Sequence, residues 1–275
     1  MPRRAWAQLA FGASMVAAVF ALTGGVGAAD GAALPLRQPS DDAQVQRGRD
    51  LFVTGCATCH GVDAKGRTLQ NGVRAPSLYG VGEASADFQL RTGRMPLASP
   101  NAQAVRKPTA YPDDEIDALV AYVGTLVGPG GPGPAIPEVD VANADLAEGG
   151  ELFRANCAAC HNASGAGGAL SQGRAAPTLW DATATELVEA MRTGPGQMPV
   201  FGPDALTTDE ADNVAAYALT LSDRESRGGF DLGAVGPVPE GFVAWVALTT
   251  VLFGAMRWIT RKPKHAKPGE TRGER

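Results

Sequence analysis

The sequence is poor in the residue types from which most catalytic and metal sites are built. Among 275 residues there are only four cysteines and three histidines. No phosphate-binding glycine loop, nucleophile triad or metal-hydrolase motif is present, and a formal net charge of −5 gives no basis for a nucleic-acid partner. No segment alternates apolar and polar residues over the length of a strand, so we expect a mainly helical fold.

All four cysteines fall within two copies of the motif C-x-x-C-H, which is the attachment signature for haem c. A single C-x-x-C is also compatible with a redox pair, a zinc half-site or a disulfide. A four-cysteine zinc site does not need a histidine directly after each pair, so two copies favour two covalently attached haem c groups and an electron-transfer function. The predicted haem attachment residues are Cys56, Cys59, Cys157 and Cys160, and the predicted proximal iron ligands are His60 and His161.

Methionine is the expected distal ligand of both irons. The third histidine, His265, lies in a basic C-terminal tail, which nearly excludes ligation by two histidines. Met95 and Met198 each precede proline and follow an Arg-Thr-Gly sequence, whereas Met191 aligns with Leu90 and is expected in the core. Ligation by histidine and methionine leaves no open iron position, which favours a carrier over a catalyst that acts on small molecules.

The internal repeat extends beyond the haem motifs, with a period of about one hundred residues. Residues 48–52 and 149–153 each predict a short amphipathic helix before the motif. Residues 112–126 and 208–221 each predict a closing helix, because acidic residues occupy the first turn and apolar residues recur at helical spacing. We expect each closing helix to pack on the first helix of its own copy.

A proline follows each haem motif at a similar distance, in Ala75-Pro76-Ser77-Leu78 and Ala176-Pro177-Thr178-Leu179. The proline carbonyl is placed to accept the free N–H of the proximal histidine, which would orient the imidazole ring. A simple turn is the other interpretation, and the sequence does not choose between them.

The repeat predicts two haem domains, residues 44–127 and 145–222, joined by a linker at 128–137. Its core, Gly-Pro-Gly-Gly-Pro-Gly-Pro at 128–134, interrupts any regular structure. Domains of this size are small for independent cores, and a covalently held haem adds a large apolar body to each. The sequence does not say whether the linker is rigid or mobile.

A membrane anchor is expected near the C-terminus. Residues 241–256 contain no charged side chain, and Arg257 is followed by Trp-Ile-Thr, so a span over 241–260 approaches the ~20 residues that a bilayer requires. A buried helix of a soluble protein is the alternative. The basic residues of the tail, 261–275, favour a cytoplasmic C-terminus, with residues 223–240 as a juxtamembrane segment.

The N-terminal segment 1–29 is either a removed signal peptide or a retained anchor. Arg3 and Arg4 precede a stretch without charges from residue 5 to 29, and Val26-Gly27-Ala28 is compatible with cleavage. We favour retention, which gives two spans, both termini inside, and haem domains outside the cytoplasmic membrane.

The charge differs strongly between the halves. Residues 30–127 hold ten basic and eleven acidic side chains, whereas residues 138–231 hold five basic and fifteen acidic ones. The anionic second half is interpreted either as a soluble surface or as a surface that steers a redox partner.

Each half resembles a class I cytochrome c domain, over residues 44–126 and 146–221. The features that carry the resemblance are the first helix, C-x-x-C-H, the proline loop, the methionine before proline, and the closing helix with its tyrosine. The segment 228–241 before the anchor, together with the domain order, is similar to the dihaem cytochrome c subunit of actinobacterial cytochrome bc1 complexes.

That resemblance implies a subunit of a menaquinol:cytochrome c reductase, a translocase, with cytochrome b and the Rieske iron-sulfur protein as partners and an aa3-type oxidase in a supercomplex. The first haem would accept electrons from the Rieske protein and the second would pass them to the oxidase. The chain itself would lack a substrate pocket.

Two other classes remain. One is a membrane-anchored dihaem carrier or the cytochrome subunit of a periplasmic dehydrogenase. The other is a haem peroxidase or gas sensor, which needs a five-coordinate iron.

Overall fold

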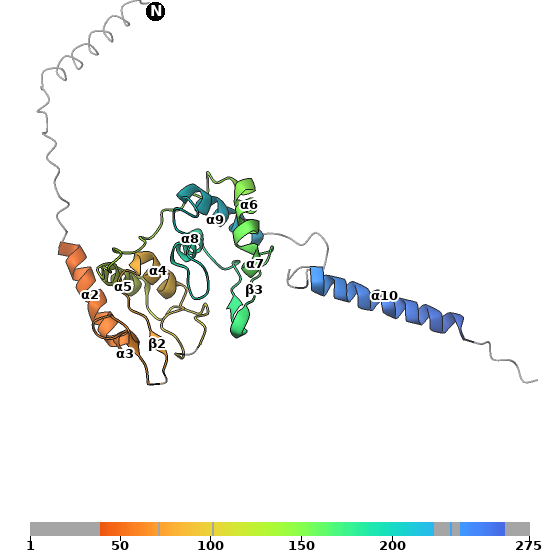
Figure 1. Cartoon of the computed structure of the whole chain (residues 1–275), viewed down its shortest axis with the longest axis horizontal. Coiled ribbons are helices and arrows are strands. Elements are labelled where there is room, and N and C mark those ends of the chain that lie inside the picture. Colours follow the sequence, from red (N-terminus) through yellow and green to blue (C-terminus); the bar gives the residue numbers. More distant parts are fainter. Residues whose placement is uncertain (1–38, 71, 101, 223–231, 233–236, 262–275) are drawn as a thin grey trace, which may run out of the picture. The chain divides into compact units, whose positions relative to one another are not determined.

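The computed structural model describes residues 39–70, 72–100, 102–222, 232 and 237–261 (Figure 1). The N-terminal segment 1–29, residues 262–275 of the tail with His265, and most of the juxtamembrane segment lie outside these residues. In the described part the fold is mainly helical, as predicted.

The first half follows a simple order of elements. Helix α2 spans Pro39–Gly55 and runs directly into the short helix α3, Ala57–His60, which carries the first haem motif. A two-residue hairpin follows, with β1 at Arg67–Thr68 antiparallel to β2 at Arg74–Ala75. Helices α4, Gly82–Arg91, and α5, Asp113–Gly124, complete the half. Helix α5 lies within the predicted range 112–126, whereas α4 and the hairpin were not predicted.

The second half repeats this order. Helix α6, Leu146–Asn156, leads into α7, Ala158–His161, with the second haem motif. Strands β3, Gly168–Ala169, and β4, Ala175–Ala176, pair antiparallel around a 3-10 turn at Ser171–Gly173. Helices α8, Ala184–Thr193, and α9, Thr208–Ser222, close the half. Helix α8 begins at a capping box between Thr183 and Glu186.

In each half the first and last helices cross at a glycine. A Cβ atom added to Gly48 would lie 1.9 Å from the carbonyl oxygen of Ala118, and one added to Gly149 would lie 2.0 Å from that of Asn213. Only glycine therefore permits the close approach of α2 to α5 and of α6 to α9. These contacts confirm the predicted packing of first and closing helices.

An aromatic pair lies beside each crossing. The ring centroids of Phe52 and Tyr122 are 5.3 Å apart, and those of Phe153 and Tyr217 are 5.5 Å apart. Both phenylalanines are almost fully buried. Tilted ring pairs at this separation stabilise the core beyond the burial of their area, by about 0.5–1.5 kcal/mol.

The glycine- and proline-rich segment after α5 packs against the first half. The amide of Ala84 donates to the carbonyl of Pro134 at 3.1 Å, and the amide of Gly80 donates to that of Leu126 at 2.7 Å. Gly128 and Gly131 form one antiparallel bridge, which the sequence did not predict. The linker is thus held along the start of α4 by backbone hydrogen bonds.

The two halves contact one another through the loop that follows α4. The side-chain amide of Gln103 donates to the carbonyl of Ala175 at 2.6 Å and accepts from its amide at 3.1 Å. Arg106 donates to Glu186 at 2.7 Å, and α4 packs against α8 (Figure 1). These contacts join side chains of the first half to the backbone and side chains of the second.

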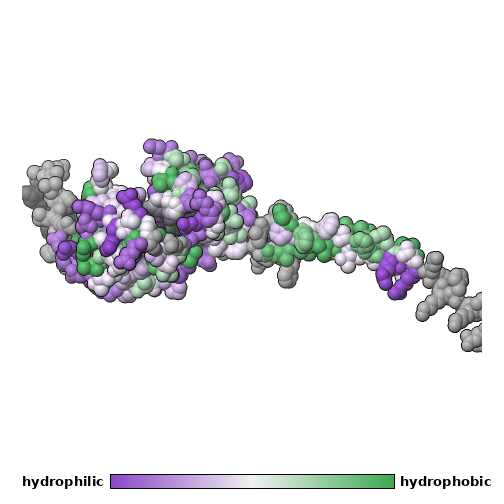
Figure 2. Space-filling model, turned by 60° about the horizontal axis from the view of Figure 1, so that its bottom comes forward, coloured by the Kyte–Doolittle hydropathy of each residue, from purple (hydrophilic) through white to green (hydrophobic). Residues whose placement is uncertain are grey.

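Helix α10, Pro237–Ile259, includes most of the predicted anchor 241–260. Its stretch Val238–Ile259 has a mean hydropathy of 1.6 and none of it is buried against the rest of the protein. Figure 2 shows this helix as a mainly hydrophobic rod. Phe242, Trp245 and Phe253 are among its exposed side chains. An exposed apolar helix of this length is a candidate membrane span.

Candidate functional site: two haem-binding motifs

The histidine of each C-x-x-C-H motif is oriented by a proline carbonyl. His60 Nδ1 lies 3.0 Å from the carbonyl oxygen of Pro76, and His161 Nδ1 lies 3.0 Å from that of Pro177. A carbonyl oxygen only accepts, so Nδ1 carries the proton and Nε2 keeps the lone pair that a metal needs. The first of the two interpretations of these prolines is confirmed.

Each haem motif forms one helical turn that begins at its first cysteine. The amides of Cys59 and His60 both donate to the carbonyl of Cys56, at 3.1 and 3.0 Å. The amides of Cys160 and His161 repeat this on Cys157, at 3.1 and 2.9 Å. One helical turn thus separates the first cysteine from the histidine in each motif.

Burial shifts the pKa of the first cysteine in each motif and of His161. It raises the pKa of Cys56 and of Cys157 to about 11, with a smaller contribution from the second cysteine of each motif. It also lowers the pKa of His161, against the opposing effect of the bond to Pro177. A neutral imidazole is the form that binds a metal.

The second motif lies in a cavity of about 590 Å³. Cys157, Cys160, His161 and Met198 all line it, in the size range of cofactor sites. Its wall is mainly apolar, with Phe153, Leu187 and Val214 among the contributors. The structure therefore brings together all four residues that the sequence predicted for the second haem, and their chemistry fits a covalently attached haem.

The first set is arranged differently. Met95 also lines this cavity, whereas Cys56, Cys59 and His60 do not. Cys56 and Met95 nevertheless pack against the same core cluster, which contains Phe52, Leu90 and other buried residues of the first half. Of the residues predicted for the first haem, only Cys56 and Met95 are thus shown to share a core cluster, and Cys59 and His60 are not among its residues.

The two methionine loops are held by basic side chains that sequence reasoning did not single out. The ammonium of Lys107 donates to the carbonyls of Gly93 and Pro96, on either side of Met95. In the second half Arg192 donates to the carbonyls of Phe201, Leu206 and Thr207, which follow Met198. Met191 is 3% exposed and belongs to the core cluster of its half, as expected.

A buried acidic pair lies where α4 meets α8. Glu189 has no exposed surface and Asp87 is 5% exposed. Within the described part of the chain, neither carboxylate oxygen of Glu189 has a hydrogen-bond donor. Burial, followed by the nearby carboxylates Asp87 and Glu186, raises the pKa of Glu189 to about 8, and Arg91 opposes this rise. Burial beside other carboxyl groups thus favours the protonated, neutral form of Glu189.

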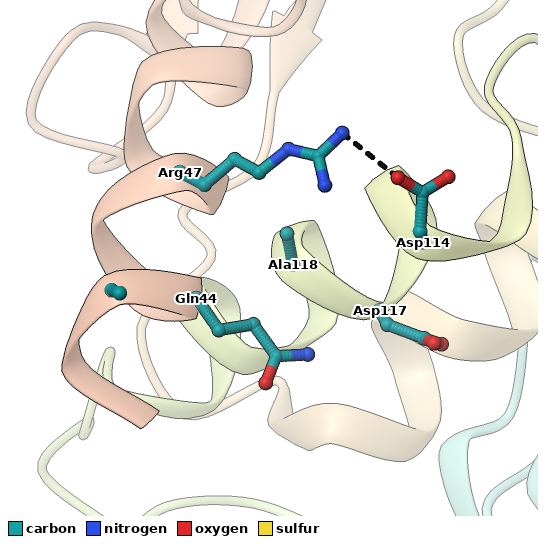
Figure 3. A pocket seen from close by; sticks show the side chains of 6 residues that line it. Gln44, Arg47, Asp114, Asp117 and Ala118 are labelled. Carbon is teal, nitrogen blue, oxygen red and sulfur yellow. Dashed lines mark ion pairs between the residues drawn. The ribbon is translucent and has the colours of Figure 1, made fainter. Parts of the chain in front are cut away.

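A second, shallower pocket lies between α2 and α5 and contains none of the predicted haem residues (Figure 3). Arg47 and Asp114 form an ion pair there at 2.9 Å, and both side chains are at least half exposed. Exposed pairs of this kind add little stability, about 0–1 kcal/mol.

Known families and relatives match both halves. The profile described as "Cytochrome c" matches residues 45–127, and the profile described as "Cytochrome C oxidase, cbb3-type, subunit III" matches residues 144–217. A protein of Corynebacterium efficiens is 40% identical over 237 residues, which cover 81% of this chain and 78% of the relative. One of Mycobacterium tuberculosis H37Rv is 40% identical over 228 residues, covering 80% and 79%. Both bear the name "Cytochrome bc1 complex cytochrome c subunit".

Two tandem domains with these motifs define a dihaem c-type cytochrome, a class that holds haem c covalently. It is an electron-transfer protein. The chain belongs to the family of cytochrome bc1 complex cytochrome c subunits.

Proposed function

We propose that the chain is the dihaem cytochrome c subunit of a cytochrome bc1 complex and transfers electrons from the Rieske iron-sulfur protein to an aa3-type terminal oxidase. The observation that carries the proposal is the duplicated site, in which each C-x-x-C-H histidine donates from Nδ1 to a proline carbonyl at 3.0 Å. Family membership supports the assignment to the complex.

The residues of the site have distinct roles in this proposal. Cys56 and Cys59 bind one haem, and Cys157 and Cys160 bind the other. His60 and His161 are the proximal ligands and Met95 and Met198 the distal ones. Haem c supplies an iron that takes up and releases one electron, and ligation from both sides leaves it no position for a substrate.

The surroundings of the second haem would keep the ligands in place during transfer. Pro177 fixes the ring of His161, and Arg192 fixes the loop after Met198. The mainly apolar wall of the cavity would limit the access of water to the haem. Little solvent would then have to reorganise when the charge of the iron changes. In this proposal Pro177 and Arg192 keep the iron ligands in position and take no part in proton transfer.

The proposed electron route is the one that the resemblance to cytochrome bc1 complex cytochrome c subunits implies. The first haem would be reduced by the Rieske protein and the second would reduce the oxidase in a supercomplex, with cytochrome b as the third partner subunit. Contacts between the halves support direct transfer, because Gln103 and Arg106 hold the second half at short range. A tethered second haem replaces a diffusing carrier and raises its effective concentration.

The proposed topology puts both haem domains outside the cytoplasmic membrane. The domains are taken as residues 44–127 and 145–222, and the anchor as residues 241–260, with the C-terminus in the cytoplasm and the N-terminal segment as a second anchor or a removed signal. Helix α10 supports the anchor through its length and hydropathy. The proton-translocating reductase activity belongs to the whole complex in this proposal.

The double variant Cys157→Ala/Cys160→Ala tests the route in membranes that contain the complete complex. It should lose one haem and stop quinol-driven oxygen reduction, while quinol still reduces the remaining haem. The matched variant Cys56→Ala/Cys59→Ala should leave the second haem in place but prevent its reduction by quinol. Oxygen uptake that persists in the first variant would show that the serial route is wrong.

A further inference from the structure

Arg94 carries a buried positive charge at the boundary between the halves. Its side chain is 8% exposed, lines the cavity of the second haem motif, and has a buried Nη1 without a hydrogen-bond partner. A guanidinium that is buried away from water and has no hydrogen-bond acceptor strongly destabilises the folded state. An acceptor of opposite charge at this position is therefore expected when the protein is complete.

Among the residues that the structure describes, no protein group accepts from Nη1 of Arg94. Its guanidinium carbon lies 4.6 Å from the ring centroid of Phe88, a contact that offers no acceptor oxygen. Burial is the main cause that lowers the pKa of Arg94, Arg106 lowers it further, and Glu186 opposes them. Glu186 is already bound to Arg106 at 2.7 Å, so two guanidiniums share one carboxylate and one positive charge remains in excess.

A second unpartnered group lies on the same wall. Gln89 lines the cavity, and its buried side-chain oxygen Oε1 has no donor. A half-turn of the amide, which exchanges its oxygen and nitrogen, would place the NH2 group there as a donor. In that orientation Gln89 and Arg94 both present hydrogen-bond donors to the cavity, which Glu186 also lines.

The cavity itself indicates the anion. It contains both cysteines, the histidine and the methionine predicted for the second haem, and haem c carries two propionate carboxylates on its edge. A carboxylate matches the fork of a guanidinium and forms two parallel, charge-assisted hydrogen bonds. We propose that Arg94, a residue of the first domain, binds a propionate of the haem held by the second domain. This rests on the proposed haem attachment at Cys157 and Cys160.

The bond has two consequences. It completes the haem site of one domain with a side chain from the other, so that the docked arrangement of the halves and the second haem stabilise each other. It also places a positive charge beside that haem, which favours the reduced iron because reduction removes a positive charge.

The test is an equilibrium redox titration of the purified complex, monitored by haem absorption. Arg94→Gln should shift the reduction equilibrium of the second haem about tenfold toward the oxidised form, the order expected when one positive charge is removed from a partly buried position near the iron. The first haem should change much less. Arg67→Gln, which removes an exposed arginine of the same domain outside the cavity, is the control and should leave both equilibria unchanged.

The component of the titration that belongs to the second haem is identified by its loss in Cys157→Ala/Cys160→Ala. Arg94→Lys keeps the charge without the fork and should give a smaller shift, and it serves as the second variant if Arg94→Gln does not accumulate. Equal equilibria in Arg94→Gln and the native protein, or a shift confined to the first haem, would overturn the proposal while the haem assignment stands. If the cysteine variant keeps both haems, the proposed function fails instead.

Discussion

Arg106 donates to Glu186 across the boundary between the two halves, at a distance of 2.7 Å. Glu186 also accepts from the amide of Thr183 and so caps helix α8. The same carboxylate thus caps the first turn of α8 in the second domain and pairs with Arg106 in a loop of the first domain. Docking of the domains and local order of α8 are coupled through this one side chain.

A double-mutant cycle should detect this coupling. Arg106→Ala leaves the Glu186 carboxylate, whose side chain is 11% exposed, without its partner, and Glu186→Gln removes the charge but can keep the cap. Because Arg106 is 35% exposed, we expect a coupling free energy of about 1 kcal/mol in denaturant unfolding. Additive effects of the two substitutions would mean that the pair does not hold the domains together.

Stability should fall as the pH rises from about 4.5 to about 8. The native pKa of Glu189 is about 8, above its ordinary value of 4.5, so the native state keeps a proton that the unfolded state releases in this window. The groups that face Glu189 are Asp87 and Arg91 of α4 and Glu186 of its own helix. Thermal unfolding midpoints measured across this range should therefore decrease.

The control is Glu189→Gln, which cannot ionise. Its unfolding midpoint should exceed that of the native protein at pH 8.5, and most of the decrease between pH 5 and 8 should be absent. If the variant keeps the same pH dependence as the native protein, Glu189 is not the group responsible.

Gly149→Ala should destabilise the second domain. The new methyl group would lie 2.0 Å from the carbonyl oxygen of Asn213, so α6 and α9 have to separate. Overpacking of this kind typically costs about 1–3 kcal/mol. Gly202→Ala is a matched control, because a Cβ atom at Gly202 meets nothing within 4 Å. Equal unfolding midpoints of the two variants would show that the crossing is not tight.

Met198 and Met191 should differ sharply in their effect on the second iron. Met198→Ala should lower the potential of that haem, abolish its weak far-red absorption band and allow rapid carbon monoxide binding after reduction. Met191→Leu should leave these properties unchanged, because Met191 is core packing. If Met191→Leu caused these changes and Met198→Ala did not, Met191 would be the iron ligand and Met198 would be core packing.

The repeated parts of the fold could be predicted from the sequence. The C-x-x-C-H motifs, the closing helices and the prolines that accept from the histidines recur in both halves, and each signal lies within a short stretch of chain. The structure confirms the hydrogen bonds of Pro76 and Pro177 and the helix crossings.

The boundary between the halves could not be predicted. Gln103 meets Ala175, and Arg106 meets Glu186, over separations of 72 and 80 residues, and no periodic pattern marks such pairs. Glu189 counted as one acid of a strongly anionic domain, yet it is fully buried. Arg94 directly precedes the predicted ligand Met95, and nothing in the sequence was a reason to assign it a role. Its burial in the structure shows that its Nη1 lacks a partner among the described residues.

The most direct test of the account is the subunit composition of the complex that the full-length chain forms in its native membrane. Purification through an affinity tag on the chain, followed by mass spectrometry, should recover cytochrome b and the Rieske protein in equal amounts with a chain that carries two haems. Recovery of a periplasmic dehydrogenase in place of these two subunits would contradict the proposed function.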